Sequence, residues 1–240
     1  MIETEEGLIQ NKMRFDKQQL ARMMDFSAVR AESDLSDIKR MAEVAKVHHP
    51  MAVFALPAWT PVLHDLLSDS PDIAIGGVVG FPSGGDTTES KVFQAEELLA
   101  MGCQELDMVI NIGKLRSGRF DEVEQDIRSV VQAANDTPVK VIFECGHLSD
   151  DQVREACHLS ARAGARFVKT GTGWADSSRI AHHISLMHDC VGHSLGIKAA
   201  GGIRDLETLM DLYERGARRF GVGVDSAIKI LDQCDTMSSD

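Results

Sequence analysis

Two lysines lie inside apolar segments that end in glycines, and they are the residues best suited to chemistry. Lys169 stands in the run Arg166–Gly173, and Lys198 stands in the run Leu195–Arg204. A charged amine is costly to remove from water unless it is paired. Burial and a neighbouring cation both favour the neutral amine, which is a nucleophile toward carbonyl carbons. The repeated pattern predicts a carbonyl-attacking lysine with a lysine partner; the alternative is two surface lysines at strand ends.

The elements around these lysines alternate between short apolar strands and amphipathic helices. We expect about eight strands, which cover Arg22–Phe26, Ala52–Leu56, Ile73–Phe81, Glu105–Ile110, Val139–Glu144, Ala165–Lys169, Ser194–Ala199 and Arg219–Val222. The helical patterns cover Leu35–His48, Ser90–Met101, Phe120–Asn135, Asp150–Ala163, Ser178–Cys190 and Leu206–Arg215. Regular alternation of strand and helix implies a parallel sheet.

The fold class that this alternation favours is a single α/β domain over residues 1–240, closed into a (β/α)8 TIM barrel. An open doubly wound sheet is the weaker alternative, because no GxGxxG fingerprint follows the first strand. The first 15 or so residues read as a polar leader, and the tail from Gln233 reads as mobile.

In such a barrel the active site lies at the carboxyl ends of the strands, where both lysines fall on neighbouring strands. Asp107 lies inside the fourth strand and needs a cationic partner, so we expect it to meet Lys198 across the barrel. Asp25 is another candidate inward carboxylate. Lys140 and Glu144 share one face of the fifth strand by the period of two. We expect them to form a structural ion pair, with a proton network as the alternative.

Composition and charge narrow the classes of partner. The net charge of -12 argues against nucleic acid and anionic membranes as partners. The five cysteines are scattered, odd in number and without CxxC spacing, which indicates a reducing cytoplasm. The chain starts without an apolar signal region, and no apolar stretch is long enough to span a membrane. Four histidines, His182, His183, His188 and His193, lack partners with metal-ligand spacing, so no metal site is expected.

Six colinear motifs together resemble the deoxyribose-phosphate aldolase family. They are Gly80–Gly85, Glu89–Glu96, Glu105–Gly113, Lys140–Gly146, Val168–Gly173 and Ile197–Arg204, and the similarity runs from about Met23 to Ile230. The resemblance implies a (β/α)8 barrel that forms a Schiff base and needs no metal or organic cofactor. It implies that Lys169 is the Schiff-base lysine, that Lys198 keeps the Lys169 amine neutral, and that Asp107 belongs to the proton relay.

The reaction that the resemblance implies is the reversible cleavage of 2-deoxy-D-ribose 5-phosphate to acetaldehyde and D-glyceraldehyde 3-phosphate. This would place the chain in carbohydrate and deoxyribonucleotide catabolism in the cytoplasm, with a small sugar phosphate as its partner. The oligomeric state stays open, with a homodimer as one option. Glycine turns after the last three strands offer backbone N–H groups to a phosphate. By the resemblance the phosphate-binding residues are Gly173, Gly201, Gly202, Arg204, Gly221 and Gly223.

The chain departs from the family pattern at positions that the resemblance places near the substrate. The family's Gly-Ala-Ser-Ser is Gly221–Val224 here, followed by Asp225, so two hydroxyls are lost and a carboxylate is gained. The family's Lys-Thr-Ser-Thr-Gly is Lys169–Gly173, followed by Trp174, and the turn after the second strand carries Trp59. A related lysine aldolase acting on a different sugar or aldehyde, phosphorylated or unphosphorylated, is therefore the alternative function. A non-enzymatic barrel that binds a sugar phosphate is a third, against which the three retained catalytic residues speak.

Overall fold

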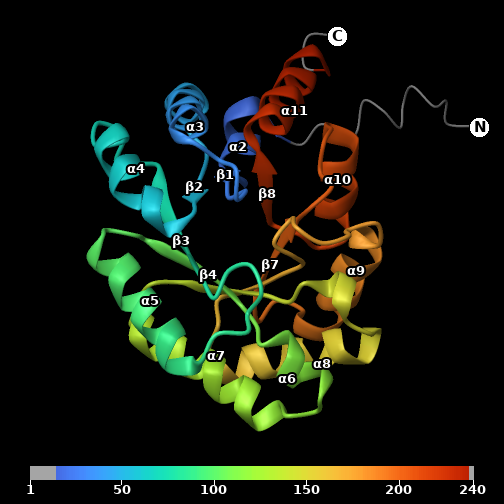
Figure 1. Ribbon diagram of the computed structural model, residues 1–240. Helices are drawn as coiled ribbons and strands as arrows, with labels where there is room; N and C mark the ends of the chain where they lie inside the picture. Colours follow the sequence, from blue (N-terminus) through green and yellow to red (C-terminus); the bar gives the residue numbers. More distant parts are fainter. Residues whose placement is uncertain (1–14, 238–240) are drawn as a thin grey trace, which may run out of the picture.

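The strands of the computed structural model, which describes residues 15–237, form a closed parallel barrel (Figure 1). They are β1 (Met24–Ala28), β2 (Ala52–Ala55), β3 (Ala74–Val79), β4 (Glu105–Val109), β5 (Val139–Ile142), β6 (Phe167–Lys169), β7 (Gly196–Ala200) and β8 (Arg219–Gly223). Strands pair in chain order, and β1 closes on β8 with Met24 opposite Phe220. The predicted barrel is confirmed, and the doubly wound alternative is wrong.

An outer ring of helices surrounds the strands (Figure 1). The helices are α2 (Lys17–Ala21), α3 (Leu35–His48), η1 (Pro57–Trp59), α4 (Thr60–Leu66), α5 (Thr88–Ala100), α6 (Ile112–Arg116), α7 (Phe120–Ala134), η2 (Cys145–His147), α8 (Asp150–Ala163), α9 (Ile180–Val191), α10 (Leu206–Glu214) and α11 (Val224–Met237). All six predicted helices are present. Within the described residues, no helix is both long enough and apolar enough to cross a bilayer.

The predicted ends of the chain fall partly outside the described residues. The leader expected over about residues 1–15 lies there except for its last residue, and α2 begins directly after Asp16, whose side chain caps it. The tail that is expected to be mobile from Gln233 belongs up to Met237 to α11. Residues 238–240 lie outside the described part.

Local sequence signals set where the helices start and stop. Asp34 and Ser149 form capping boxes at the starts of α3 and α8, so backbone N–H groups of the first turn find partners. Gly164 ends α8 in the left-handed conformation, at a φ of 88°, which glycine adopts without strain. These signals explain why α3 and α8 have the bounds that the sequence predicts.

The strands divide the interior into two parts, because successive side chains point to opposite faces. The outward residues, such as Val53, Leu106 and Ile197, join one apolar core beneath the helices. Six charged side chains point inward from β4 to β8. Phe54 is the large inward ring of β2, and it fits only because β3 carries glycine opposite: a Cβ on Gly76 would lie 2.1 Å from the ring. The charged side chains of the lumen pack against this ring, and the Lys198 amine lies 4.1 Å from its centre.

Candidate active site

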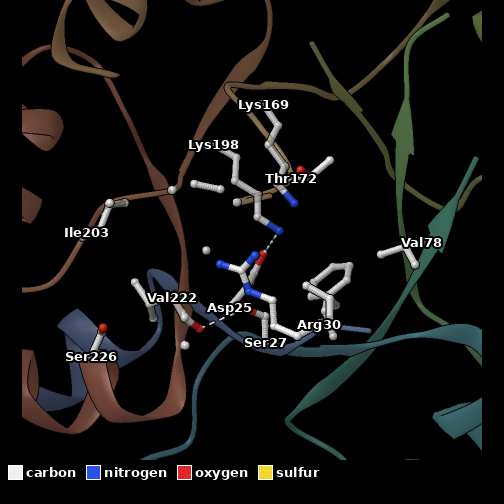
Figure 2. A pocket seen from close by; sticks show the side chains of 18 of the residues that line it. Asp25, Ser27, Arg30, Val78, Lys169, Thr172, Lys198, Ile203, Val222 and Ser226 are labelled. Carbon is white, nitrogen blue, oxygen red and sulfur yellow. Dashed lines mark hydrogen bonds and ion pairs between the residues drawn. The ribbon is translucent and has the colours of Figure 1, made fainter. Parts of the chain in front are cut away.

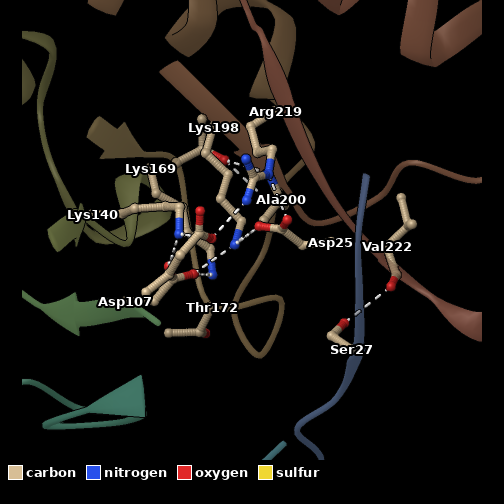
Figure 3. Close-up of polar contacts among 12 residues, drawn as sticks. Asp25, Ser27, Asp107, Lys140, Lys169, Thr172, Lys198, Ala200, Arg219 and Val222 are labelled. Atoms are coloured by element: carbon tan, nitrogen blue, oxygen red, sulfur yellow. Dashed lines mark hydrogen bonds and ion pairs between the residues drawn. The ribbon is translucent and has the colours of Figure 1, made fainter. Parts of the chain in front are cut away.

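Lys169 and Lys198 lie side by side in the barrel lumen. They are register partners on β6 and β7, and each Nζ lies 2.7 Å from the same oxygen, Asp107 Oδ2 (Figure 3). Both lysines are buried, and the Asp107 side chain on β4 is fully buried. The structure thus brings together the three residues that the sequence singled out, and it excludes two surface lysines.

Lys198 has a second carboxylate partner, Asp25 of β1. Their Nζ and Oδ2 atoms lie 2.5 Å apart, so Asp25 points inward as predicted. Arg219 of β8 holds the other Asp25 oxygen at 2.5 Å and also binds Glu105 at 2.6 Å. Lys198 is therefore fixed between two carboxylates, and Arg219 fixes one of them.

Lys140 does not pair with Glu144, so the predicted ion pair is wrong. The Lys140 amine lies 2.7 Å from Glu105 Oε2 and 3.1 Å from Asp107 Oδ1. Strand β5 ends at Ile142, and Glu144 takes a left-handed backbone conformation, at a φ of 55°, so the period of two no longer governs its direction. Its carboxylate instead accepts hydrogen bonds from the backbone N–H and the hydroxyl of Thr172.

The sign of each charge in the lumen depends on which half of the chain supplies the side chain. The three carboxylates come from β1 and β4, and the four bases come from β5 to β8; they are Asp25, Glu105 and Asp107, and Lys140, Lys169, Lys198 and Arg219. Bases outnumber acids by one, and arginine does not lose its proton in proteins. One lysine can therefore be neutral while every other charge in the lumen stays paired.

The electrostatics separate the roles of the buried groups. Burial alone would raise the pKa of the Asp107 carboxyl, but Lys140, Lys169 and Lys198 hold that pKa well below its usual range. Burial lowers the pKa of Lys198 to about 8, against the attraction of Asp107 and Asp25. Lys198 is thus mostly protonated at neutral pH, yet it can release and regain a proton there. Asp107 stays ionised.

A pocket of about 280 Å³ opens above these lysines (Figure 2). Every residue predicted to bind phosphate lines it: Gly173, Gly201, Gly202, Arg204, Gly221 and Gly223. Sequence reasoning missed four other polar residues of the lining. They are Ser27 of β1, Arg30 from the loop after β1, Thr172 from the loop after β6 and Ser226 from the first turn of α11. Their places at the end of a strand and at the start of a helix were the available signal.

Two departures from the family pattern lie outside this pocket. The Asp225 side chain is 86% exposed and pairs with Arg40 at 2.5 Å, so it does not face the substrate site. Trp59 packs against the apolar core and does not line the pocket. A third departure, Gly171, has a structural reason: a Cβ there would lie 2.6 Å from Glu144 Oε1.

Lys91 on α5 is a buried lysine outside the lumen. Its amine lies 2.6 Å from Asp126 Oδ2 and donates to the Val109 carbonyl at 3.0 Å. We expect Lys91→Met to lower the free energy of unfolding by about 3 kcal/mol, because it leaves the buried Asp126 carboxylate without its cation. Urea unfolding followed by circular dichroism measures this loss, and an unchanged midpoint would contradict it. Since Lys91 does not line the pocket, we expect kcat to change by less than about threefold.

The described residues contain no cluster of three or more His, Cys, Asp or Glu side chains placed to hold a metal ion. His182 instead pairs with Asp150, at 2.8 Å, on the outer surface. The chemistry at the pocket floor has to be read from its lysines and carboxylates.

A closed (β/α)8 barrel with lysine amines on a shared carboxylate below its pocket is the arrangement of a lysine-dependent aldolase. The chain belongs to the DeoC/LacD family of aldolases, whose family model matches residues 13–226. It is therefore an enzyme of the lyase class, as predicted.

Curated relatives resemble the chain over most of its length. A deoxyribose-phosphate aldolase of Klebsiella pneumoniae is 42% identical over 217 residues, which cover 90% of this chain and 87% of the relative. One of Sinorhizobium medicae is 42% identical, with the same coverage of both chains. The deoxyribose phosphate aldolase of Aeropyrum pernix, described as tetrameric, shares the fold with a TM-score of 0.85 over 98% of this chain and 99% of its own, at 24% identity.

Proposed function

We propose that this chain reversibly cleaves 2-deoxy-D-ribose 5-phosphate to acetaldehyde and D-glyceraldehyde 3-phosphate through a Schiff base on Lys169. The observation that carries the proposal is the pair of amines, Lys169 and Lys198, on one oxygen of Asp107 at the pocket floor. Both lysines line the pocket, but Lys169 is the nucleophile because its side chain is the more exposed of the two and has one carboxylate partner, whereas Lys198 is held by two. The family and the curated relatives support the same reaction.

The first step joins the substrate to the enzyme. The neutral Lys169 amine attacks the aldehyde carbon of the open-chain sugar, and loss of water leaves an iminium. Protonated Lys198 gives its proton to the departing water and is left neutral, so it can then remove the proton of the C3 hydroxyl as the bond between C2 and C3 breaks. The hydroxyl carbon leaves as the aldehyde of glyceraldehyde 3-phosphate, and the electron pair of the broken bond forms an enamine on Lys169.

The second half returns the enzyme to its starting state. The enamine carbon takes up a proton, which gives the iminium of acetaldehyde, and water hydrolyses this iminium to acetaldehyde and free Lys169. Lys198 is suited to move these protons because its pKa of about 8 lies close to neutral pH. Asp107 is a weak base, since its pKa lies well below the usual range, so its role is to hold both amines and a water in place.

The phosphate of the substrate is assigned to the glycine turns after β6, β7 and β8. Gly201 and Gly202 lie on the pocket wall next to Arg204, whose guanidinium has no partner within residues 15–237. Asp225 points away from the pocket, so it does not repel a dianion there. This arrangement favours the phosphorylated sugar over the unphosphorylated alternative, although both family serines are absent.

Substrate preference tests this assignment. We expect Arg204→Ala to raise the KM for deoxyribose 5-phosphate by about tenfold, and to raise the KM for unphosphorylated deoxyribose much less, because a charge-assisted hydrogen bond is lost only with the phosphate. Asp225→Ser is the matched control on the same rim, and it should leave the preference between the two sugars within about twofold of wild type. Equal cleavage of both sugars by the wild type would favour the unphosphorylated alternative. Cleavage of neither would point to another aldol substrate.

Two further expectations stay predictions. A homodimer is one assembly that light scattering on the purified chain can test, and a cytoplasmic location can be tested by fractionating cells. Neither expectation affects the chemistry proposed for the pocket.

A further inference from the structure

Arg30 is an unpaired cation at the mouth of the pocket. It follows β1, lines the pocket, and extends over the cavity in Figure 2. Its backbone N–H donates to Ser33 Oγ at 3.2 Å, whereas its guanidinium has no hydrogen-bond or ion-pair partner within residues 15–237. The chain has 37 acidic residues against 25 lysines and arginines, so partners for an arginine are plentiful. An unpaired guanidinium over a pocket is a binding group for an anion.

A second unpaired guanidinium lines the same pocket. Arg204 comes from the loop after β7, and Arg30 comes from the loop after β1, so the two approach from different loops. Gly202 and Gly223 lie on the wall that they share. Two cations in one small pocket repel each other, and a phosphate dianion between them relieves that repulsion. A site of this kind favours a doubly charged terminal group over a hydroxyl.

Trp174 holds the loop that carries Arg30. Its indole N–H donates to the Val29 carbonyl at 2.9 Å, which joins the loop after β6 to the residue directly before Arg30. The indole ring also packs edge-on against Phe81, with the ring centres 5.9 Å apart. The Trp174 backbone is in turn fixed by the Thr172 hydroxyl at 3.0 Å. The Arg30 backbone is therefore tied to the same loop that follows the Schiff-base lysine.

We propose that Arg30 and Arg204 form a two-guanidinium clamp for the phosphate of the substrate, and that Trp174 is a positioning residue that holds Arg30 over the pocket. This proposal rests on the proposed function. It assigns to Arg30 a role in selecting the substrate class, which is aldehyde sugars with a terminal phosphate monoester. It supplies charge where the family pattern has the two serine hydroxyls that this chain lacks.

The test compares deoxyribose 5-phosphate with unphosphorylated deoxyribose in steady-state cleavage. We expect Arg30→Met to raise the KM for the phosphorylated sugar about tenfold, with kcat lowered less than about threefold, because a contact to a non-reacting group mainly contributes ground-state binding. The kcat/KM for the unphosphorylated sugar should change by less than about threefold. Arg30→Lys should recover part of the loss, because the charge is kept without the planar fork. Lys39→Met, which removes an exposed charge on α3 outside the pocket, is the control.

A double-mutant cycle tests the role of Trp174. Trp174→Phe keeps a ring against Phe81 but removes the N–H that binds Val29, so it should raise the KM for the phosphorylated sugar several-fold. In the Arg30→Met background it should add little, because the guanidinium that it positions is gone. Additive effects would show that Trp174 acts independently of Arg30. An Arg30→Met enzyme with wild-type preference for the phosphate would overturn the clamp.

Failure of the clamp and failure of the proposed function give different results. Acetaldehyde carries no phosphate, so borohydride should trap it on Lys169 in wild type and in Arg30→Met alike. If acetaldehyde is trapped on Lys169 but Arg30→Met keeps the wild-type preference for the phosphorylated sugar, the clamp is rejected and the aldolase chemistry stands. If no aldehyde is trapped on Lys169 in the wild type, the aldolase chemistry itself is wrong at this residue.

Discussion

Lys169→Ala is expected to lower kcat for cleavage of deoxyribose 5-phosphate by roughly 10⁴-fold or more, because no other group can form the covalent intermediate. The protein should still fold. The Asp107 carboxylate keeps Lys140 and Lys198 as partners, so removing one amine does not leave a buried charge unpaired. Circular dichroism and a melting curve check the fold, and a coupled assay for glyceraldehyde 3-phosphate measures kcat.

The site of attachment distinguishes Lys169 from Lys198 as the nucleophile. Borohydride reduction with acetaldehyde should add a two-carbon group to the peptide that contains Lys169 in wild type, and to no peptide in Lys169→Ala. Lys91→Met provides a matched control, since Lys91 is equally buried but lies outside the lumen, and trapping should persist there. Normal activity in Lys169→Ala would make Lys198 the nucleophile.

Lys198→Leu is expected to lower kcat/KM at pH 7 by roughly 10²- to 10⁴-fold, because a positioned acid–base group is lost. Its neighbours should stay paired, since Asp25 keeps Arg219 and Asp107 keeps Lys140 and Lys169.

The wild type should lose activity above neutral pH. The proposed mechanism needs protonated Lys198, whose pKa is about 8, so kcat/KM should fall as pH rises through about 8. This alkaline limb should be absent in Lys198→Leu, and also in Lys198→Arg, which keeps the charge but does not titrate in this range. If both variants still lose kcat/KM near pH 8, a group other than Lys198 causes the alkaline limb.

The barrel was predictable because its signals are local. Each strand is a short apolar run, and helices such as α3 and α8 are bounded by capping residues and glycine. The signals were weaker for α11, because it starts directly where β8 ends, without a turn residue between them. No helix was therefore predicted over Val224–Met237, and the short helices α2, α4 and α6 were missed as well.

The charged lumen was predictable only in part, because pairing depends on which strands face each other. Lys169, Lys198 and Asp107 stood out as polar residues within apolar runs. Arg219 stands at the first position of β8, where a charge is ordinary, so its inward direction left no trace in the sequence. Glu105 shares the face of Asp107 by the period of two, and this signal was available but not used. Arg30 lies in a loop, and its place over the pocket depends on a hydrogen bond between segments 145 residues apart.

The separation of charge sign between the two halves of the chain has a consequence for how the barrel assembles. A piece containing β1 to β4 would carry a lumen of carboxylates, and a piece containing β5 to β8 would carry a lumen of bases. Two copies of either piece would bury like charges together, at a cost of several kcal/mol per unpaired ion. Only an acidic half and a basic half neutralise each other. Cut between β4 and β5, the chain is therefore expected to rebuild a barrel from one copy of each fragment and never from two of the same.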